Sequence, residues 1–101
     1  MTQVKINDTT YPAVIDGQTV DFAWDGRESK SITLEMTHAD ADELFLDDAA
    51  WSIVHDGTEY DNSDFSVAGD ITGHRDGTLT IKMGKPTDLE LAYEELYGGD
   101  L

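Results

Sequence analysis

Apolar and polar residues alternate in short segments along most of the chain. Residues 4–6 alternate in this way, Asn7-Asp8 then predicts a turn, and residues 9–11 begin a returning strand. Pro12 makes that second strand either an edge strand or a short one, because proline has no N–H to give to a β-ladder. The pattern therefore predicts an amino-terminal β-hairpin.

The same period-two alternation recurs further along the chain, where it predicts strands with one buried face and one wet face. The apolar positions of these segments are Val20, Phe22 and Trp24; Ile32, Leu34 and Met36; Tyr60, Phe65 and Val67, within a predicted strand region of residues 58–67; and Leu79, Ile81 and Met83. Trp51 begins another strand-like segment, residues 51–55, and both tryptophans are predicted to lie in the core. Turns are predicted at the four Asp-Gly pairs, which suit positive φ angles, at 16–17, 25–26, 56–57 and 76–77.

Two segments change to helical spacing. Residues 38–50 carry a helical apolar stripe, with Thr37 as the predicted N-cap. A second helix is predicted at the carboxyl end, where residues 87–90 match the capping-box pattern and Gly98-Gly99 follows the apolar stripe. The stripe of the first helix is Ala41, Leu44, Phe45 and Ala49, and that of the second is Leu89, Ala92, Tyr93 and Leu96.

These elements together predict an α+β fold: one antiparallel sheet of five to seven strands with two helices, the second of them C-terminal. The length of 101 residues fits a single acidic domain over residues 1–101. Cysteine is absent, which excludes disulfides and thiolate chemistry. The chain has no apolar stretch long enough to span a membrane and no signal-peptide pattern at its start, so we expect a cytoplasmic protein or a component of a particle.

Charge is the most unusual property of the sequence. The 22 acidic and 6 basic residues give a formal net charge of −16. This charge argues against direct binding to nucleic acid or to anionic lipid, both of which would repel it. Lys and Arg are absent between Ser31 and His74, and the acidic residues there and near the C-terminus form a candidate interaction surface for a protein partner. Its members are Asp40, Glu43, Asp47, Asp48, Glu59, Asp61, Asp64, Glu90 and Glu94.

Motifs for catalysis or cofactor binding are absent. The histidines His38, His55 and His74 lie far apart and match no metal-ligand spacing, and no nucleophile elbow or phosphate-binding loop occurs. We therefore expect no enzyme activity and no cofactor. Residues 56–64 are rich in oxygen ligands but do not fit the EF-hand spacing. A polar hairpin tip explains them, and weak Ca²⁺ binding stays open as an alternative.

A segment within the last third of the chain resembles a group of phage proteins. Residues 76–87, Asp-Gly-Thr-Leu-Thr-Ile-Lys-Met-Gly-Lys-Pro-Thr, and the closing Tyr97-Gly98-Gly99 resemble small proteins encoded among the tail genes of prophages in Gram-positive bacteria. The likeness covers about a quarter of the chain and carries no chemical motif. It implies an accessory or assembly role in a phage-like particle and transfers no functional residue.

The leading functional hypothesis is a small, non-enzymatic protein-interaction or assembly module. Exposed strands near residues 11–12 or 61–65 are candidate sites for pairing with a partner strand. The alternative is a DNA mimic, because same-face residues of a strand lie roughly 6.6 Å apart, similar to neighbouring phosphates. A third interpretation assigns the acidic residues to solubility and to the wet faces of the elements alone.

Overall fold

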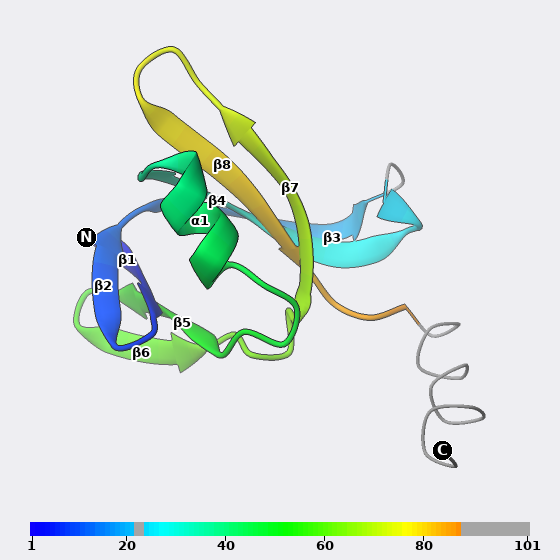
Figure 1. The fold of residues 1–101 in the computed structure, drawn as a ribbon. Coiled ribbons are helices and arrows are strands. Elements are labelled where there is room, and N and C mark those ends of the chain that lie inside the picture. Colours follow the sequence, from blue (N-terminus) through cyan, green and yellow to red (C-terminus); the bar gives the residue numbers. More distant parts are fainter. Residues whose placement is uncertain (22–23, 88–101) are drawn as a thin grey trace.

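The computed structural model describes residues 1–21 and 24–87, and for residues 18–21 the backbone alone. This part of the chain forms eight strands and one short helix (Figure 1). In chain order they are β1 (Thr2–Ile6), β2 (Thr9–Pro12), β3 (Val14–Asp21), β4 (Arg27–Glu35), α1 (His38–Leu44), β5 (Trp51–His55), β6 (Thr58–Asp61), β7 (Val67–Gly73) and β8 (Thr78–Gly84).

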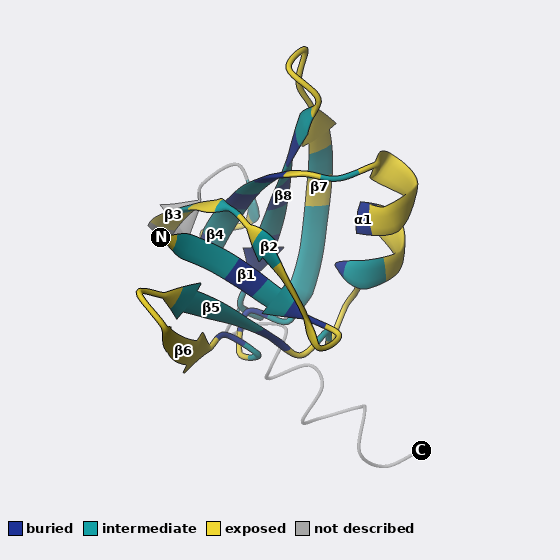
Figure 2. Ribbon diagram, turned by 90° about the vertical axis from the view of Figure 1, so that its left-hand side faces the viewer, coloured by how far each residue is buried: buried dark blue, intermediate teal, exposed yellow. Residues whose placement is uncertain are grey.

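The described strands form two antiparallel four-stranded sheets, ordered β2-β1-β5-β6 and β3-β4-β8-β7. The two halves of the chain repeat one arrangement, because β1 to β4 and β5 to β8 contribute equivalent strands to the two sheets. The central ladders, β1 with β5 and β4 with β8, join the first half to the second. Helix α1 lies against β7, on the side where the two sheets open (Figures 1 and 2).

The predicted α+β fold with one sheet and two helices is wrong. The described residues are mostly β, with two sheets and a single helix of seven residues. The alternation of apolar and polar residues predicted the strands, but not which strands pair with each other. Ala13 alone separates β2 from β3, yet the chain passes there from one sheet to the other, and residues 62–66 make the equivalent passage. The predicted C-terminal helix lies outside the described residues.

The core lies between the two sheets and under α1 (Figure 2). Trp51 is buried, as predicted, and its indole Nε1 donates a hydrogen bond to the Phe65 carbonyl at 3.1 Å. Their rings meet edge to face, with centroids 6.5 Å apart. The buried apolar residues are Val4, Ile6, Ile32, Leu34, Ala41, Phe45, Trp51, Phe65, Leu79, Ile81 and Met83.

Trp24 occupies a different environment from Trp51. It is half-buried, and its ring lies over Gly69 and Gly84. The Arg27 guanidinium stacks on the ring, with its carbon 4.7 Å from the centroid, and Arg27 Nε donates to the Trp24 carbonyl. The prediction that Trp24 belongs to the core is therefore only partly right, because the ring covers the outer end of the second sheet.

Three of the predicted tight turns adopt left-handed backbone. Both residues of Asn7-Asp8, Asp25-Gly26 and Asp56-Gly57 have positive φ. The pairs at 7–8 and 56–57 are the two-residue turns of hairpins, which such angles suit. At 76–77, Gly77 has the positive φ. The pair Asp16-Gly17 is an exception, because it lies inside β3 and makes no turn. A dipeptide that permits a turn does not require one when both flanking segments find a partner strand.

Helix α1 is shorter than predicted. Thr37 caps it as expected, since its Oγ1 accepts the Asp40 N–H at 3.2 Å. The helix ends at Leu44 rather than near residue 50. The Asp48 N–H instead donates to the Ser66 carbonyl at 2.7 Å, and Asp47 Oδ1 accepts the Ala68 N–H at 2.8 Å. The Phe45 N–H still donates to the Ala41 carbonyl at 2.9 Å, but residues 47 and 48 bond to the chain around β7 and do not continue the helix.

Strand β6 is also shorter than predicted. It ends at Asp61, and a new strand in the other sheet begins at Val67, so residues 58–67 are not one strand. Tyr60 was predicted as an apolar, buried position but is 55% exposed. The reason is its place on an edge strand, where no described element covers the ring.

No helix among the described residues is long and apolar enough to cross a membrane.

We expect Ile32→Ala to lower the free energy of unfolding by about 2–5 kcal/mol, since Ile32 is fully buried between the sheets and its truncation leaves a cavity. Urea denaturation followed by tryptophan fluorescence measures the change. Val14→Ala is the control, because Val14 is 63% exposed and its loss is expected to cost less than about 0.5 kcal/mol. Equal effects of the two variants would contradict the assigned core.

We expect Gly84→Ala to destabilise the protein by about 1–3 kcal/mol, because a Cβ at this position would lie 2.7 Å from Arg27 Cδ and 2.8 Å from Trp24 Cζ3. The Trp24 ring must move, so the tryptophan emission spectrum is expected to shift. The matched variant Gly17→Ala has no atom within 4 Å of its new Cβ and should leave stability and emission nearly unchanged.

Candidate functional site

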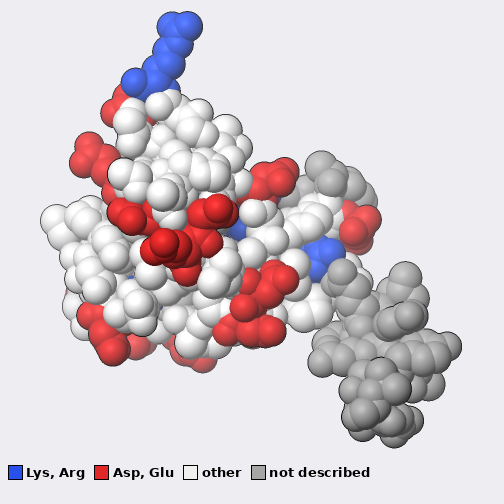
Figure 3. All heavy atoms as spheres, viewed as in Figure 1, with Lys and Arg blue, Asp and Glu red and all other residues white. Residues whose placement is uncertain are grey.

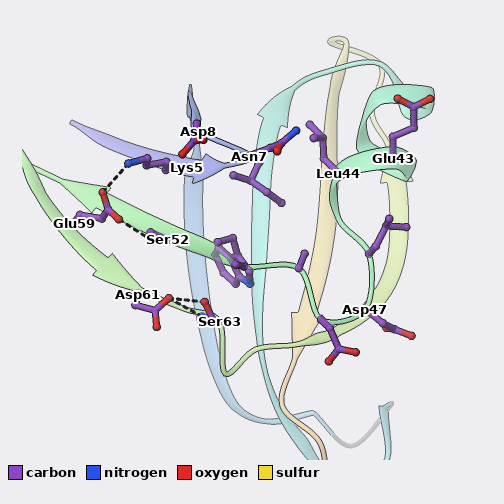
Figure 4. A pocket seen from close by; sticks show the side chains of 16 residues that line it. Lys5, Asn7, Asp8, Glu43, Leu44, Asp47, Ser52, Glu59, Asp61 and Ser63 are labelled. Atoms are coloured by element: carbon purple, nitrogen blue, oxygen red, sulfur yellow. Dashed lines mark hydrogen bonds and ion pairs between the residues drawn. The ribbon is translucent and has the colours of Figure 1, made fainter.

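An open pocket of about 570 Å³ lies between the first sheet and the segment around α1. One wall comes from the end of β1, the turn after it, the start of β5, and the end of β6 with the residues that follow it. The other comes from the end of α1 and the loop of residues 46–50 (Figure 4). Trp51 forms part of the lining between the two walls. The pocket is thus assembled from segments far apart in the sequence.

Carboxylates are the main charged groups of the lining. Among the described residues that line the pocket, six are acidic and one, Lys5, is basic. Five of the predicted surface residues come together here: Glu43, Asp47, Asp48, Glu59 and Asp61. The prediction missed Asp8, which completes the acidic set. Asp8 was interpreted as a turn residue. The pairing of β1 with β5 places this turn beside the pocket.

The other predicted surface residues do not join this group. Asp40 and Asp64 are exposed but line no part of the pocket. The Asp64 carboxylate lies 3.4 Å from Lys85 Nζ, which also pairs with Glu28 at 2.9 Å. The hydrogen bond with Glu28 raises the pKa of Lys85. Glu90 and Glu94 lie outside the described residues.

Lys5 is already engaged within the pocket. Its Nζ lies 3.2 Å from Glu59 Oε1, and Glu59 Oε2 accepts a hydrogen bond from Ser52 Oγ at 3.2 Å (Figure 4). Both charged side chains are about a third to a half exposed, so this ion pair is weak and opens at little cost. Lys5 therefore neutralises only part of the surrounding negative charge.

Asp61 is held in a local turn with Ser63. Its Oδ1 accepts hydrogen bonds from Ser63 Oγ at 2.5 Å and from the Ser63 N–H at 3.2 Å (Figure 4). These bonds favour the charged carboxylate and lower the pKa of Asp61 below its usual value. Asp61 is therefore ionised throughout the neutral and mildly acidic range.

Asp47 and Asp48 shape the opposite wall. Asp47 is tied to the Ala68 N–H, and Asp48 has a positive φ of 64°. Glu43 differs from both, because it is exposed on the last turn of α1 and anchors nothing in its surroundings among the described contacts. Its carboxylate is available for a ligand without loss of structure.

Basic residues lie mostly elsewhere. Lys30 and Lys85 each place Nζ over the Phe65 ring, at 4.5 and 5.1 Å from its centroid, and Lys30 Nζ also donates to Asn62 Oδ1. The space-filling view shows acidic side chains over α1 and below it, with few basic ones between them (Figure 3). The pocket therefore carries a negative field that these lysines do not offset.

The geometry of residues 56–64 does not support the calcium-binding alternative. Asp56 Oδ1 binds the Met1 ammonium at 2.8 Å, which, together with nearby His55, lowers the pKa of Asp56. Asp61 is engaged with Ser63. The part of the chain that the structure describes contains no group of three or more His, Asp or Glu side chains placed to hold a metal ion.

The arrangement of the pocket suits electrostatic binding of a cation. The carboxylates lie around an open, solvated hollow rather than in the dry, enclosed site that raises carboxyl pKa values for acid–base work. Ammonium or guanidinium groups of a partner would meet several acceptor oxygens there.

Comparison with known proteins gives no family assignment: no protein-family model, no curated protein and no solved structure matches the chain.

We expect Ser63→Ala to raise the pKa of Asp61 toward its usual value of about 3.9, because the substitution removes the hydroxyl donor and leaves only the residue 63 N–H. Carboxyl-carbon NMR titration measures it. A lowered folded-state pKa stabilises the protein above the unfolded pKa, and that contribution disappears as the pH falls through the folded value. Asp76, whose pKa is lowered by Thr78 in a separate turn, is the internal control and should not move.

Proposed function

We propose that this protein is a non-enzymatic protein-interaction module whose acidic pocket binds a basic segment of a protein partner. The observation that carries the proposal is the composition of the pocket: six carboxylates and one lysine among its described lining residues. Opposite charge across such a surface speeds association and selects the partner, while like-charged molecules are repelled.

We propose that the protein takes part in the assembly of a phage-like particle, and that it acts in the particle or in the cytoplasm. This proposal rests on the resemblance of residues 76–87 and 97–99 alone. Residues 78–84 of that segment form β8, a central strand of the second sheet. Strand β8 therefore belongs to the scaffold, whereas the pocket lies on the other sheet.

DNA mimicry is the alternative, and the geometry favours it less. A mimic needs carboxylates in a regularly spaced row. Of the candidate acidic residues that the structure describes, Glu59 and Asp61 alone lie on a strand, and Glu59 is paired with Lys5. The others lie on α1 or in loops.

We expect the double variant Glu43→Gln/Asp48→Asn to lose most of the binding to a basic partner, since both side chains line the pocket. Asparagine tolerates the positive φ of residue 48, so the fold should be kept. The matched control is Asp42→Asn/Asp70→Asn. It removes the same amount of charge from exposed positions outside the pocket lining and should bind nearly as wild type.

Pull-down from a host-like lysate with all three proteins, followed by titration of the recovered partner, measures the difference. A partner that is lost with the pocket variant and kept with the control supports the proposal. Equal loss with both variants would show that only net charge matters. A recovered nucleic-acid-binding protein that competitor DNA displaces would favour the mimic instead.

A further inference from the structure

Strand β6 presents a free edge beside the pocket. It is the last strand of the first sheet, so the described residues offer it no neighbour on its outer side. The Asn62 N–H donates to the Trp51 carbonyl at 2.8 Å. In an antiparallel ladder every second residue bonds to the neighbouring strand, so this bond and the register show which residues of β6 bond to β5. Tyr60 and Thr58 therefore bond inward to β5, and the N–H and C=O groups of Glu59 and Asp61 point outward.

The other edge strands are less suited to pairing. Of the four edges that the described strands form, β2 carries Pro12 at an outward-facing position of its ladder, where no N–H is available. The repeat of the two halves places Pro12 at the position equivalent to Asp61. Strands β3 and β7 each contain a register shift, which disrupts the regular row of donors and acceptors. Strand β6 has neither feature.

The side chains along β6 select what can pair with it. Glu59 and Asp61 lie on the face that lines the pocket, and Tyr60, 55% exposed, lies on the opposite face. A second copy of β6 would bring carboxylates opposite carboxylates, which is unfavourable. A segment with basic side chains at alternate positions would instead pair opposite charges directly across the ladder.

We propose that β6 binds an extended segment of a protein partner as an added antiparallel strand. The segment carries Lys or Arg at two alternate positions, opposite Glu59 and Asp61, with an apolar residue between them that packs on Tyr60. This inference rests on the proposed function and specifies its partner: main-chain hydrogen bonds hold the segment at the edge, and its basic side chains enter the acidic pocket.

Backbone methylation of a probe peptide tests the added strand. The probe is the end-blocked pentapeptide acetyl-Thr-Lys-Val-Lys-Thr-amide, titrated into the intact ¹⁵N-labelled protein. In the proposed pairing the lysine N–H groups bond to β6, whereas the valine N–H points away. We expect methylation of both lysine amides to weaken binding by about tenfold or more, and methylation of the valine amide to have little effect. The Glu59 and Asp61 amide resonances should shift most.

Each other outcome identifies which idea fails. If both methylated peptides bind as the unmodified one does, and Glu43→Gln/Asp48→Asn weakens all three alike, strand addition is overturned while the acidic pocket keeps its role. Binding that shifts pocket resonances but leaves those of Glu59 and Asp61 in place leads to the same conclusion. No binding of the unmodified peptide at low salt overturns the inference and the proposed function together.

Discussion

The ladders between β1 and β5 and between β4 and β8 are the contacts on which everything else in the described structure depends. Each joins a strand of the first half to its equivalent in the second half. They pair Ile6 with Trp51 and Val4 with Ile53 in one sheet, and Ile32 with Ile81 in the other. Apolar burial between the sheets, the main favourable contribution to folding, becomes available only once both ladders exist.

The pocket is a product of the same pairing. Lys5 and Asp8 come from the first half, and Glu59 and Asp61 from the second, and the ladder between β1 and β5 places them on one rim. The opposite rim, around Glu43, is held by the hydrogen bonds that residues 47 and 48 make with the chain around β7. The acidic surface therefore depends on contacts in both sheets.

Local patterns predicted the local structure well. The turn at Asn7-Asp8, the cap at Thr37 and the buried face around Ile32 and Leu34 were all readable, because neighbouring residues determine them. The division of the strands into two sheets was not, since alternation gives the faces of a strand but not its neighbours. The length of α1 was also missed, because distant residues, Ser66 and Ala68, supply the competing hydrogen bonds.

The sequence predicted which acidic residues could form a binding surface, but not which of them lie together. Glu43, Glu59 and Asp61 were predicted on charge alone, together with Asp64. Asp64 pairs with Lys85 and does not line the pocket. Only tertiary structure separates acidic residues that line a common hollow from those that do not. The order of strands within each sheet, which sets the free edges, is likewise a property of the whole chain.

The interlocked halves also bear on how the chain folds as it is made. Hydrogen-bonded residues across the two central ladders, such as Thr2 with His55 and Thr33 with Thr80, are 53 and 47 residues apart. Such long-range pairing slows folding, because a large loop must close before the contacts form. On the ribosome, the edges of β1 and β4 that pair with β5 and β8 remain unpaired until those later strands have emerged. During that interval the nascent chain is open to wrong strand partners.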